Sequence, residues 1–310
     1  MIGARRGGRA RDILGECMAD GGGRAVKLSA ADMRFVVAEM LDCRMSRQYE
    51  RFTSYVDPAV VLHCHSWRVG IVGPKVWRGA SGVRELFRRT DENYLPLGYE
   101  IVDILVDGEN AVVRWRADWR RHENGCIYTN DAAHFLRWEN GLVVEMHEFF
   151  DAHCPSTPGC ACPPSFEALF TPRPAGLSRD EMERRARKLI SFEEDGPDHV
   201  LLRQWCSPDI VCEFVGDKSR IPYAGRHIGI EAVIGIIRAI RVEFEQRLQG
   251  VSDVLIEDSR VGGRRHVQWR HRGTGRTGVS ELADFVRFDD GLIVELIEFR
   301  DTVTLRRMQD

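Results

Sequence analysis

Apolar residues recur at helical spacing in residues 28–44, which read LSAADMRFVVAEMLDCR. Phe35, Val36 and Met40 fall roughly on one stripe, and Ser29 is the expected N-cap. Shorter helices are predicted over residues 49–56 and 81–94, with a β-rich stretch over 59–67. Apolar and polar residues then alternate in a way that predicts four strands, over residues 99–107, 110–121, 127–138 and 142–151. Helices followed by a curved antiparallel sheet form an α+β cone, with the helices on one face of the sheet.

The same pattern occurs a second time about 150 residues later. The stretch GLVVEMHEFFD returns as GLIVELIEFRD, and residues 125–151 align with residues 275–301 without a gap. Eleven of these 27 positions are identical. Upstream, Trp115 is matched with Trp269, which requires a longer hairpin in the second copy. The period is far longer than that of a solenoid repeat, so a whole domain is duplicated.

Length and composition fit two globular domains. The chain has 310 residues, of which 43% are hydrophobic and 29% charged, and such a chain accommodates two domains of about 150 residues. The repeat predicts domains over residues 28–155 and 177–310, joined by a linker over 156–176 that is rich in proline and cysteine. Residues 1–27 are rich in glycine and arginine and lack the continuous apolar centre of a secretory signal, so a disordered arm is expected.

Charge and cysteine content limit the partners and the compartment. The net charge of −3 gives no sign of a nucleic-acid partner. The sequence contains no run of 18 apolar residues, so no membrane span is expected. Nine scattered cysteines fit reduced thiols, so a cytoplasmic location is expected. One cluster could present ligands to a metal, namely His153, Cys154, Cys160 and Cys162, but it lacks the paired C-x-x-C spacing of structural zinc sites. The favoured interpretation is a plain linker, and no metal or cofactor is expected.

The order of the elements and the two closing strands, GLVVEMHEFFD and GLIVELIEFRD, resemble the nuclear transport factor 2-like superfamily, and within it SnoaL-like and ketosteroid-isomerase-like domains. The resemblance covers residues 28–155 and 177–305. It implies two tandem cystatin-like cones, each with a deep apolar pocket that has polar groups at its bottom. Members of this superfamily commonly dimerise through the sheet, so an intrachain pseudo-dimer is expected, and a further homodimer is left open. The superfamily holds enzymes as well as non-catalytic binders.

Alternation along the strands predicts which side chains face the pocket. In the closing hairpin, Trp138 is expected to face Leu142, which would set His134 opposite Met146 and Glu148 one diagonal step away. The matching residues of the second copy are Asp284, Leu296 and Glu298.

Two enzyme patterns of the superfamily involve the first strand. Ketosteroid isomerases carry a base carboxylate there, which falls at His63 and, in the second copy, at Glu213. Their second acid falls at His134 and Asp284, whereas their helix tyrosine has no convincing match. Scytalone-dehydratase-like enzymes pair pocket histidines with a helix aspartate, and His63, His134 and Asp42 could fill these parts.

A third pattern involves a middle strand. Limonene-epoxide-hydrolase-like enzymes carry Arg-x-Asp there and an acid on the closing strand, a set that Arg116, Asp118 and Glu148 would supply. In the second copy Arg272 stands where the aspartate would be. An arginine cannot give up its proton near neutral pH, so hydrolysis is expected in the first copy alone.

These patterns favour a cofactor-independent acid–base enzyme of epoxide hydrolase, dehydratase, isomerase or cyclase type, acting on a small apolar or polycyclic molecule. A carboxylate in an apolar pocket has a raised pKa, and a histidine exchanges protons near neutral pH. The candidate catalytic residues are His63, Arg116, Asp118, His134 and Glu148. The candidate substrate-binding residues are Trp67, Trp115, Trp138, Met146, Phe150, Glu213, Asp284 and Glu298. The alternative is a non-catalytic small-molecule-binding or scaffold protein in which the second copy is a built-in partner.

Overall fold

A computed structural model describes residues 27–65, 75–150, 174–191, 199–216, 218 and 221–310. The predicted disordered arm, most of the predicted linker and the candidate Trp67 lie outside the described residues. No helix in the described part of the chain is long and apolar enough to cross a membrane.

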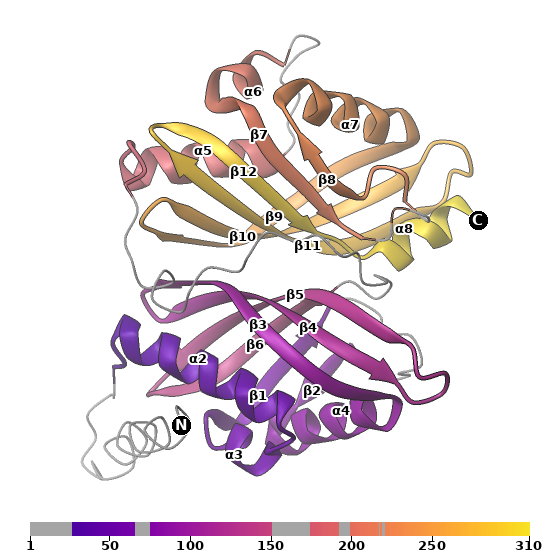
Figure 1. The fold of residues 1–310 in the computed structure, drawn as a ribbon. Coiled ribbons are helices and arrows are strands. Elements are labelled where there is room, and N and C mark those ends of the chain that lie inside the picture. The colour runs from indigo at the N-terminus through magenta and orange to yellow at the C-terminus, as the bar shows by residue number, and fades with distance from the viewer. Residues whose placement is uncertain (1–26, 66–74, 151–173, 192–198, 217, 219–220) are drawn as a thin grey trace.

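Each half of the chain packs helices against a six-stranded sheet (Figure 1). The first unit consists of α2 (Ala30–Met45), α3 (Tyr49–Thr53), β1 (Val56–Cys64), β2 (Val76–Arg78), α4 (Gly79–Asn93), β3 (Tyr94–Asp107), β4 (Asn110–Arg121), β5 (Ile127–Glu139) and β6 (Leu142–Phe150). The second unit consists of α5 (Arg179–Ser191), α6 (Val200–Trp205), β7 (Cys206–Val215), β8 (Gly225–Ile228), α7 (Ile230–Glu243), β9 (Phe244–Glu257), β10 (Arg260–His271), β11 (Thr277–Asp289), β12 (Leu292–Phe299) and α8 (Thr302–Gln309). The predicted tandem α+β cones are confirmed.

Local sequence explains where the first helix begins. The Ser29 side chain accepts a hydrogen bond from the Asp32 amide, while the Asp32 side chain accepts one from the Ser29 amide, which makes a capping box. The apolar stripe of α2 then packs into the core of the first unit, which also takes in the inward side chains of α4 and of every strand of the sheet. At the other end of the chain, α8 packs Leu305 and Met308 into the core of the second unit.

The two sheets have the same strand order, β2-β1-β6-β5-β4-β3 and β8-β7-β12-β11-β10-β9. The first and closing strands of each unit pair in parallel, whereas all the other pairs are antiparallel. The sheets are therefore mixed, not wholly antiparallel as expected. The closing hairpin brings the last strand back beside the first one, and the two strands run in the same direction.

From the first strand onward, the strands of the two units that carry the site correspond at an offset of 150 residues. Strands β4 and β10 are both 12 residues long and begin at Asn110 and Arg260, and β3 and β9 are both 14 residues long. The longer hairpin predicted for the second copy does not exist, so matching Trp115 with Trp269 is wrong. At this offset Arg265 corresponds to Trp115. Likewise Gln268, and not Arg272, corresponds to Asp118.

The two sheets face each other, and the helices lie on their outer sides (Figure 1). Apolar side chains from both sheets form one buried cluster, made of Leu105, Val112, Ala133, Phe135, Phe149, Val215, Leu255, Ala283, Phe285, Ile297 and Phe299. At the edge of this cluster the Val106 amide donates a hydrogen bond to Glu257, and the Ile256 amide donates one to Asp107. The donor–acceptor distance is 3.0 Å in both. Because these residues correspond between the units, the contact is reciprocal, as in a two-fold symmetric dimer.

Candidate active site in the first unit

The closing hairpin sets the two central residues of the site directly opposite each other. Trp138 pairs with Val143, the register then shifts by one residue of β6, and His134 pairs with Glu148. The shift is a β-bulge, in which one strand carries an extra residue. The predicted pairing of His134 with Met146 is therefore wrong, and the two ionisable side chains lie closer together than alternation alone predicted.

His134 and Glu148 form a buried ion pair at the inner face of the sheet. Nε2 of His134 lies 3.2 Å from Oε2 of Glu148, and the two residues are only 7% and 3% exposed. The Trp115 ring meets the His134 ring edge-on at 5.3 Å between centroids. Cys64 Sγ lies 4.0 Å from Oε1 of Glu148. A carboxylate and an imidazole this close, and this far from water, can hold and exchange a proton.

The pair borders a small apolar cavity between the sheet and the helices. Its volume is about 20 Å³, enough for about one water molecule. The cavity is lined mainly by apolar and aromatic side chains, among them Met40, Phe87, Trp115, Trp119, Leu136 and Met146. The Trp115 Nε1 atom is buried and has no hydrogen-bond acceptor among the described residues. A buried donor of this kind is costly unless a water or a ligand accepts its hydrogen bond.

A charged residue also lines this cavity. The Arg44 guanidinium lies 4.6 Å from the Phe87 ring centroid and 5.2 Å from that of Trp119, and its Nη1 lies 3.0 Å from Asp91. The cation is therefore held by two aromatic faces and one carboxylate, which compensates for its burial.

The epoxide-hydrolase-like set does not assemble. Trp115, Ala117 and Trp119 point into the core, so the alternating residues Arg116 and Asp118 point away from it. Asp118 is exposed and accepts a hydrogen bond from Thr129, 2.5 Å away, whereas Arg116 forms a bidentate ion pair with Asp131. The predicted convergence of Arg116, Asp118 and Glu148 on one cavity is therefore wrong.

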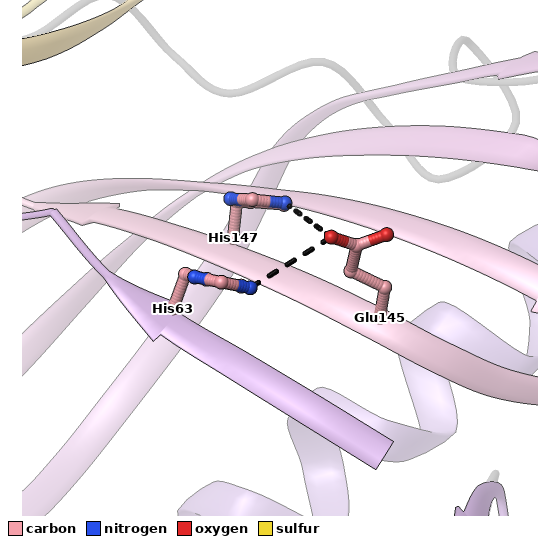
Figure 2. Close-up of side chains that lie close together, drawn as sticks. All are labelled: His63, Glu145 and His147. Carbon is pink, nitrogen blue, oxygen red and sulfur yellow. Dashed lines mark hydrogen bonds and ion pairs between the residues drawn. The ribbon is translucent and has the colours of Figure 1, made fainter. Parts of the chain in front are cut away.

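The first-strand candidates also face outward. Leu62 lines the cavity, and its neighbour His63 therefore lies on the other face of the sheet, beside Glu145 and His147 (Figure 2). Glu213, the counterpart of His63, lies close to Asp131 of the first unit, and burial followed by the Asp131 charge raises its pKa. The prediction that these two residues act inside the cones is wrong.

The helix residue proposed for the dehydratase pattern does not reach the cavity. Asp42 is exposed on α2, and its carboxylate lies 3.4 Å from the Tyr99 hydroxyl. On the first strand, the side chain that approaches Glu148 is that of Cys64, which sequence reasoning did not select. Its place could have been found by pairing β1 with β6, because Cys64 lies opposite Glu148 in that register.

The remaining candidates of the first unit divide between cavity and core. Trp115 and Met146 line the cavity. Trp138 and Phe150 belong to the buried core of the first unit and do not line the cavity.

At the position that corresponds to the His134–Glu148 pair, the interior of the second unit is occupied by charged side chains. Arg265 is fully buried and contacts Asp284 at 2.8 Å and Glu298 at 2.6 Å, and Arg300 also contacts Glu298. Asp284 and Glu298 pair in register as His134 and Glu148 do in the first unit, and they are the corresponding residues. They are therefore the anions of a closed ionic network.

Comparison with known proteins identifies the fold family of the first unit. Residues 37–146 match the SnoaL-like domain family. The first unit is a SnoaL-like domain. The second unit lies outside that match and has the same strand order as the SnoaL-like unit. No curated protein matches the chain.

Solved structures similar to this chain include three bacterial proteins. An NTF2-like protein from Burkholderia xenovorans LB400 is 20% identical, with a TM-score of 0.39, over 43% of this chain and 98% of its own. A putative isomerase from Rhodopseudomonas palustris is also 20% identical, with a TM-score of 0.38 and the same coverage of both chains. A putative SnoaL-like polyketide cyclase from Jannaschia sp. CCS1 is 14% identical, with a TM-score of 0.35, over 42% of this chain and 94% of its own.

Proposed function

We propose that the SnoaL-like unit is a cofactor-independent acid–base enzyme that moves a proton on a small, largely apolar carbonyl compound, as isomerases, lyases and cyclases do. The observation that carries this proposal is the buried pair of His134 and Glu148 at an apolar cavity, beside the unsatisfied N–H of Trp115. Two proton-exchanging groups and one hydrogen-bond donor then border the same small space.

Each of these groups has a part in such a reaction. The Glu148 carboxylate takes a proton from the carbon next to the carbonyl. The electron pair of that C–H bond forms the C=C bond of the enolate, and the π pair of the C=O bond moves onto the oxygen. The Trp115 N–H donates to the resulting enolate oxygen, in the way that oxyanion-hole donors stabilise developing charge. The His134–Glu148 pair then returns the proton to another carbon, or the enolate expels a leaving group or attacks a second carbonyl.

The size of the cavity favours a second function, non-catalytic binding. A volume of about 20 Å³ admits no molecule much larger than water, so a substrate has to displace side chains. A protein that bound a ligand in this way without turning it over would need no proton exchange. The two functions therefore differ in one measurable property, which is proton exchange between the protein and a bound ligand.

Hydrogen–deuterium exchange into a panel of cyclic and aryl ketones, followed by mass spectrometry in D₂O, measures that property. The protein is expected to catalyse exchange next to the carbonyl of at least one ketone. Glu148→Gln is expected to lower the rate by about 100-fold or more, the usual contribution of a general base. Trp115→Phe is expected to cost a similar factor, as for one oxyanion donor.

Asp118→Asn is the matched control, because Asp118 lies outside the cavity, and it is expected to keep the full rate. Saturable ketone binding without exchange would favour the non-catalytic function. Exchange that is unchanged in folded Glu148→Gln would remove Glu148 from the reaction.

A further inference from the structure

A second group of ionisable side chains lies on the face of the first sheet that is turned toward the second unit. His63 on β1 pairs in register with His147 on β6, and both rings lie beside Glu145 (Figure 2). Nε2 of His147 is 3.1 Å and Nε2 of His63 is 3.7 Å from the same carboxylate oxygen, Oε1 of Glu145. The reaction proposed for the interior of the cone uses none of these residues.

We propose that His63, Glu145 and His147 bind a divalent transition-metal ion of the zinc class. The three ligand atoms lie within 4.8 Å of one another. Two ligand atoms about 2.1 Å from a tetrahedral zinc ion are about 3.4 Å apart. The two observed separations from Oε1 of Glu145, 3.1 Å to His147 and 3.7 Å to His63, are close to this value. Two imidazoles and one carboxylate are also a common ligand set for zinc and its neighbours.

Neighbouring groups orient these ligands. Nε of Arg137 lies 3.1 Å from Oε2 of Glu145, which leaves Oε1 for the metal. When the metal takes Nε2 of His147, the ring proton moves to Nδ1, and Nε2 of His65, 2.8 Å away, accepts it. Such hydrogen bonds fix the tautomer of metal-binding histidines. The Arg264 guanidinium, which contacts Nδ1 without the metal, then turns to its other partners, Asp253 and Glu281.

The site is open to solvent on one side. The side chains of His63 and Glu145 are 29% and 33% exposed, and that of His147 is 9% exposed. Three protein ligands with access to water leave a fourth position for a water molecule or a small ligand. The two rings are nearly parallel, at 6° and 4.5 Å between centroids, so a metal ion is expected to tilt one of them.

An adjacent set made of His65, His147 and Glu281 fits less well. Arg264 contacts Nδ1 of His147 and lies 3.0 Å from Glu281, so a cation already interacts with two of its three members. Nε of Arg264 also donates a hydrogen bond to Asp253, 2.7 Å away. In the first set, Arg137 contacts Oε2 of Glu145 and Arg264 contacts Nδ1 of His147, which are not the proposed ligand atoms.

Cobalt(II) titration of the chelator-treated full-length protein tests the proposal, with visible absorption and equilibrium dialysis as readouts. A parallel series carries Cys154→Ser, Cys160→Ser and Cys162→Ser, so that thiolates of that segment cannot bind the metal. One cobalt ion per chain is expected in both series, displaced by zinc. His63→Asn and Glu145→Gln are expected to weaken binding at least about tenfold.

Glu281→Gln is the matched control, because it removes the carboxylate of the adjacent set, and it is expected to lose less affinity than Glu145→Gln. Circular dichroism of the metal-free variants confirms that they fold. Absence of stoichiometric binding would overturn the proposal. So would undiminished binding by folded His63→Asn, or a larger loss in Glu281→Gln than in Glu145→Gln.

Discussion

The first unit has a tryptophan at position 115, and the second has an arginine at the corresponding position 265. Trp115 leaves a cavity beside His134 and Glu148, and its N–H has no acceptor among the described residues. Arg265 instead extends between Asp284 and Glu298 and neutralises both. One side chain thus separates a small cavity in the first unit from a set of ion pairs at the same position in the second.

Arg265→Met is expected to destabilise the protein by about 3–5 kcal/mol, because it leaves buried Asp284 without its guanidinium partner. Urea unfolding followed by fluorescence measures the change. Arg270→Met is the control on the same strand, since the Arg270–Glu245 pair is about half exposed and is expected to contribute less than about 1 kcal/mol. Equal losses in the two variants would contradict this account of the second interior.

At the level of single residues, the sequence predicted His134 and Glu148 but misplaced several of their companions. His63, Arg116 and Asp118 were chosen by analogy with family patterns. The strand alternation around Leu62 and Trp115 places all three on the face of the sheet that is turned away from the cavity. Cys64 was missed because its approach to Glu148 depends on a parallel pairing of β1 with β6. Pairing between distant strands is not encoded in local periodicity.

At the level of elements, the helices, the strands and the duplication were predictable because apolar periodicity and the repeated closing strand are local signals. The exact registers of the strand pairs could not be predicted in this way. A bulge in the β5–β6 hairpin shifts the partner of His134 from Met146 to Glu148. Bulges leave little trace in a single sequence, yet here one brings the candidate catalytic pair together.

Close approach of strands from different units rests on a glycine. A Cβ atom at Gly262 on β10 would lie 2.6 Å from Cγ1 of Val112 on β4, which is fully buried. Gly262→Val is therefore expected to destabilise the protein by about 1–3 kcal/mol through overpacking. Gly250→Val on β9 is the control, because nothing lies within 4 Å of its added Cβ. Thermal unfolding compares them, and a stabilised Gly262→Val would contradict the close approach.

At the level of the whole molecule, the two sheets shield ionisable groups from water between them. Glu213 faces Asp131, Arg114 and Arg116 of the other unit, and burial is the main reason why its pKa is raised. A raised folded-state pKa means that the folded protein disfavours the charged carboxylate. Glu213 therefore costs stability at neutral pH, and this cost disappears as the pH falls through the folded pKa toward the unfolded value near 4.5.

Glu213→Gln is accordingly expected to stabilise the protein at pH 7 and to have little effect near pH 4.5. Urea unfolding of both proteins across this range measures the difference. A variant that is less stable than the parent at pH 7 would show that Arg114 and Arg116 outweigh the burial of Glu213.

The central claim is that a ligand binds beside the His134–Glu148 pair of the SnoaL-like unit and not at the corresponding position of the second unit, where Arg265 stands. A crystal structure of the full-length protein soaked with 2-naphthol, an apolar ring with an enol-like oxygen, tests it most directly. The account predicts naphthol in the cavity of the first unit, with its oxygen within hydrogen-bond distance of Trp115 Nε1 and of the His134–Glu148 pair, and none beside Arg265 at the corresponding position of the second unit. Naphthol between Arg265 and Glu298, or absent from the first cavity at saturation, would contradict it.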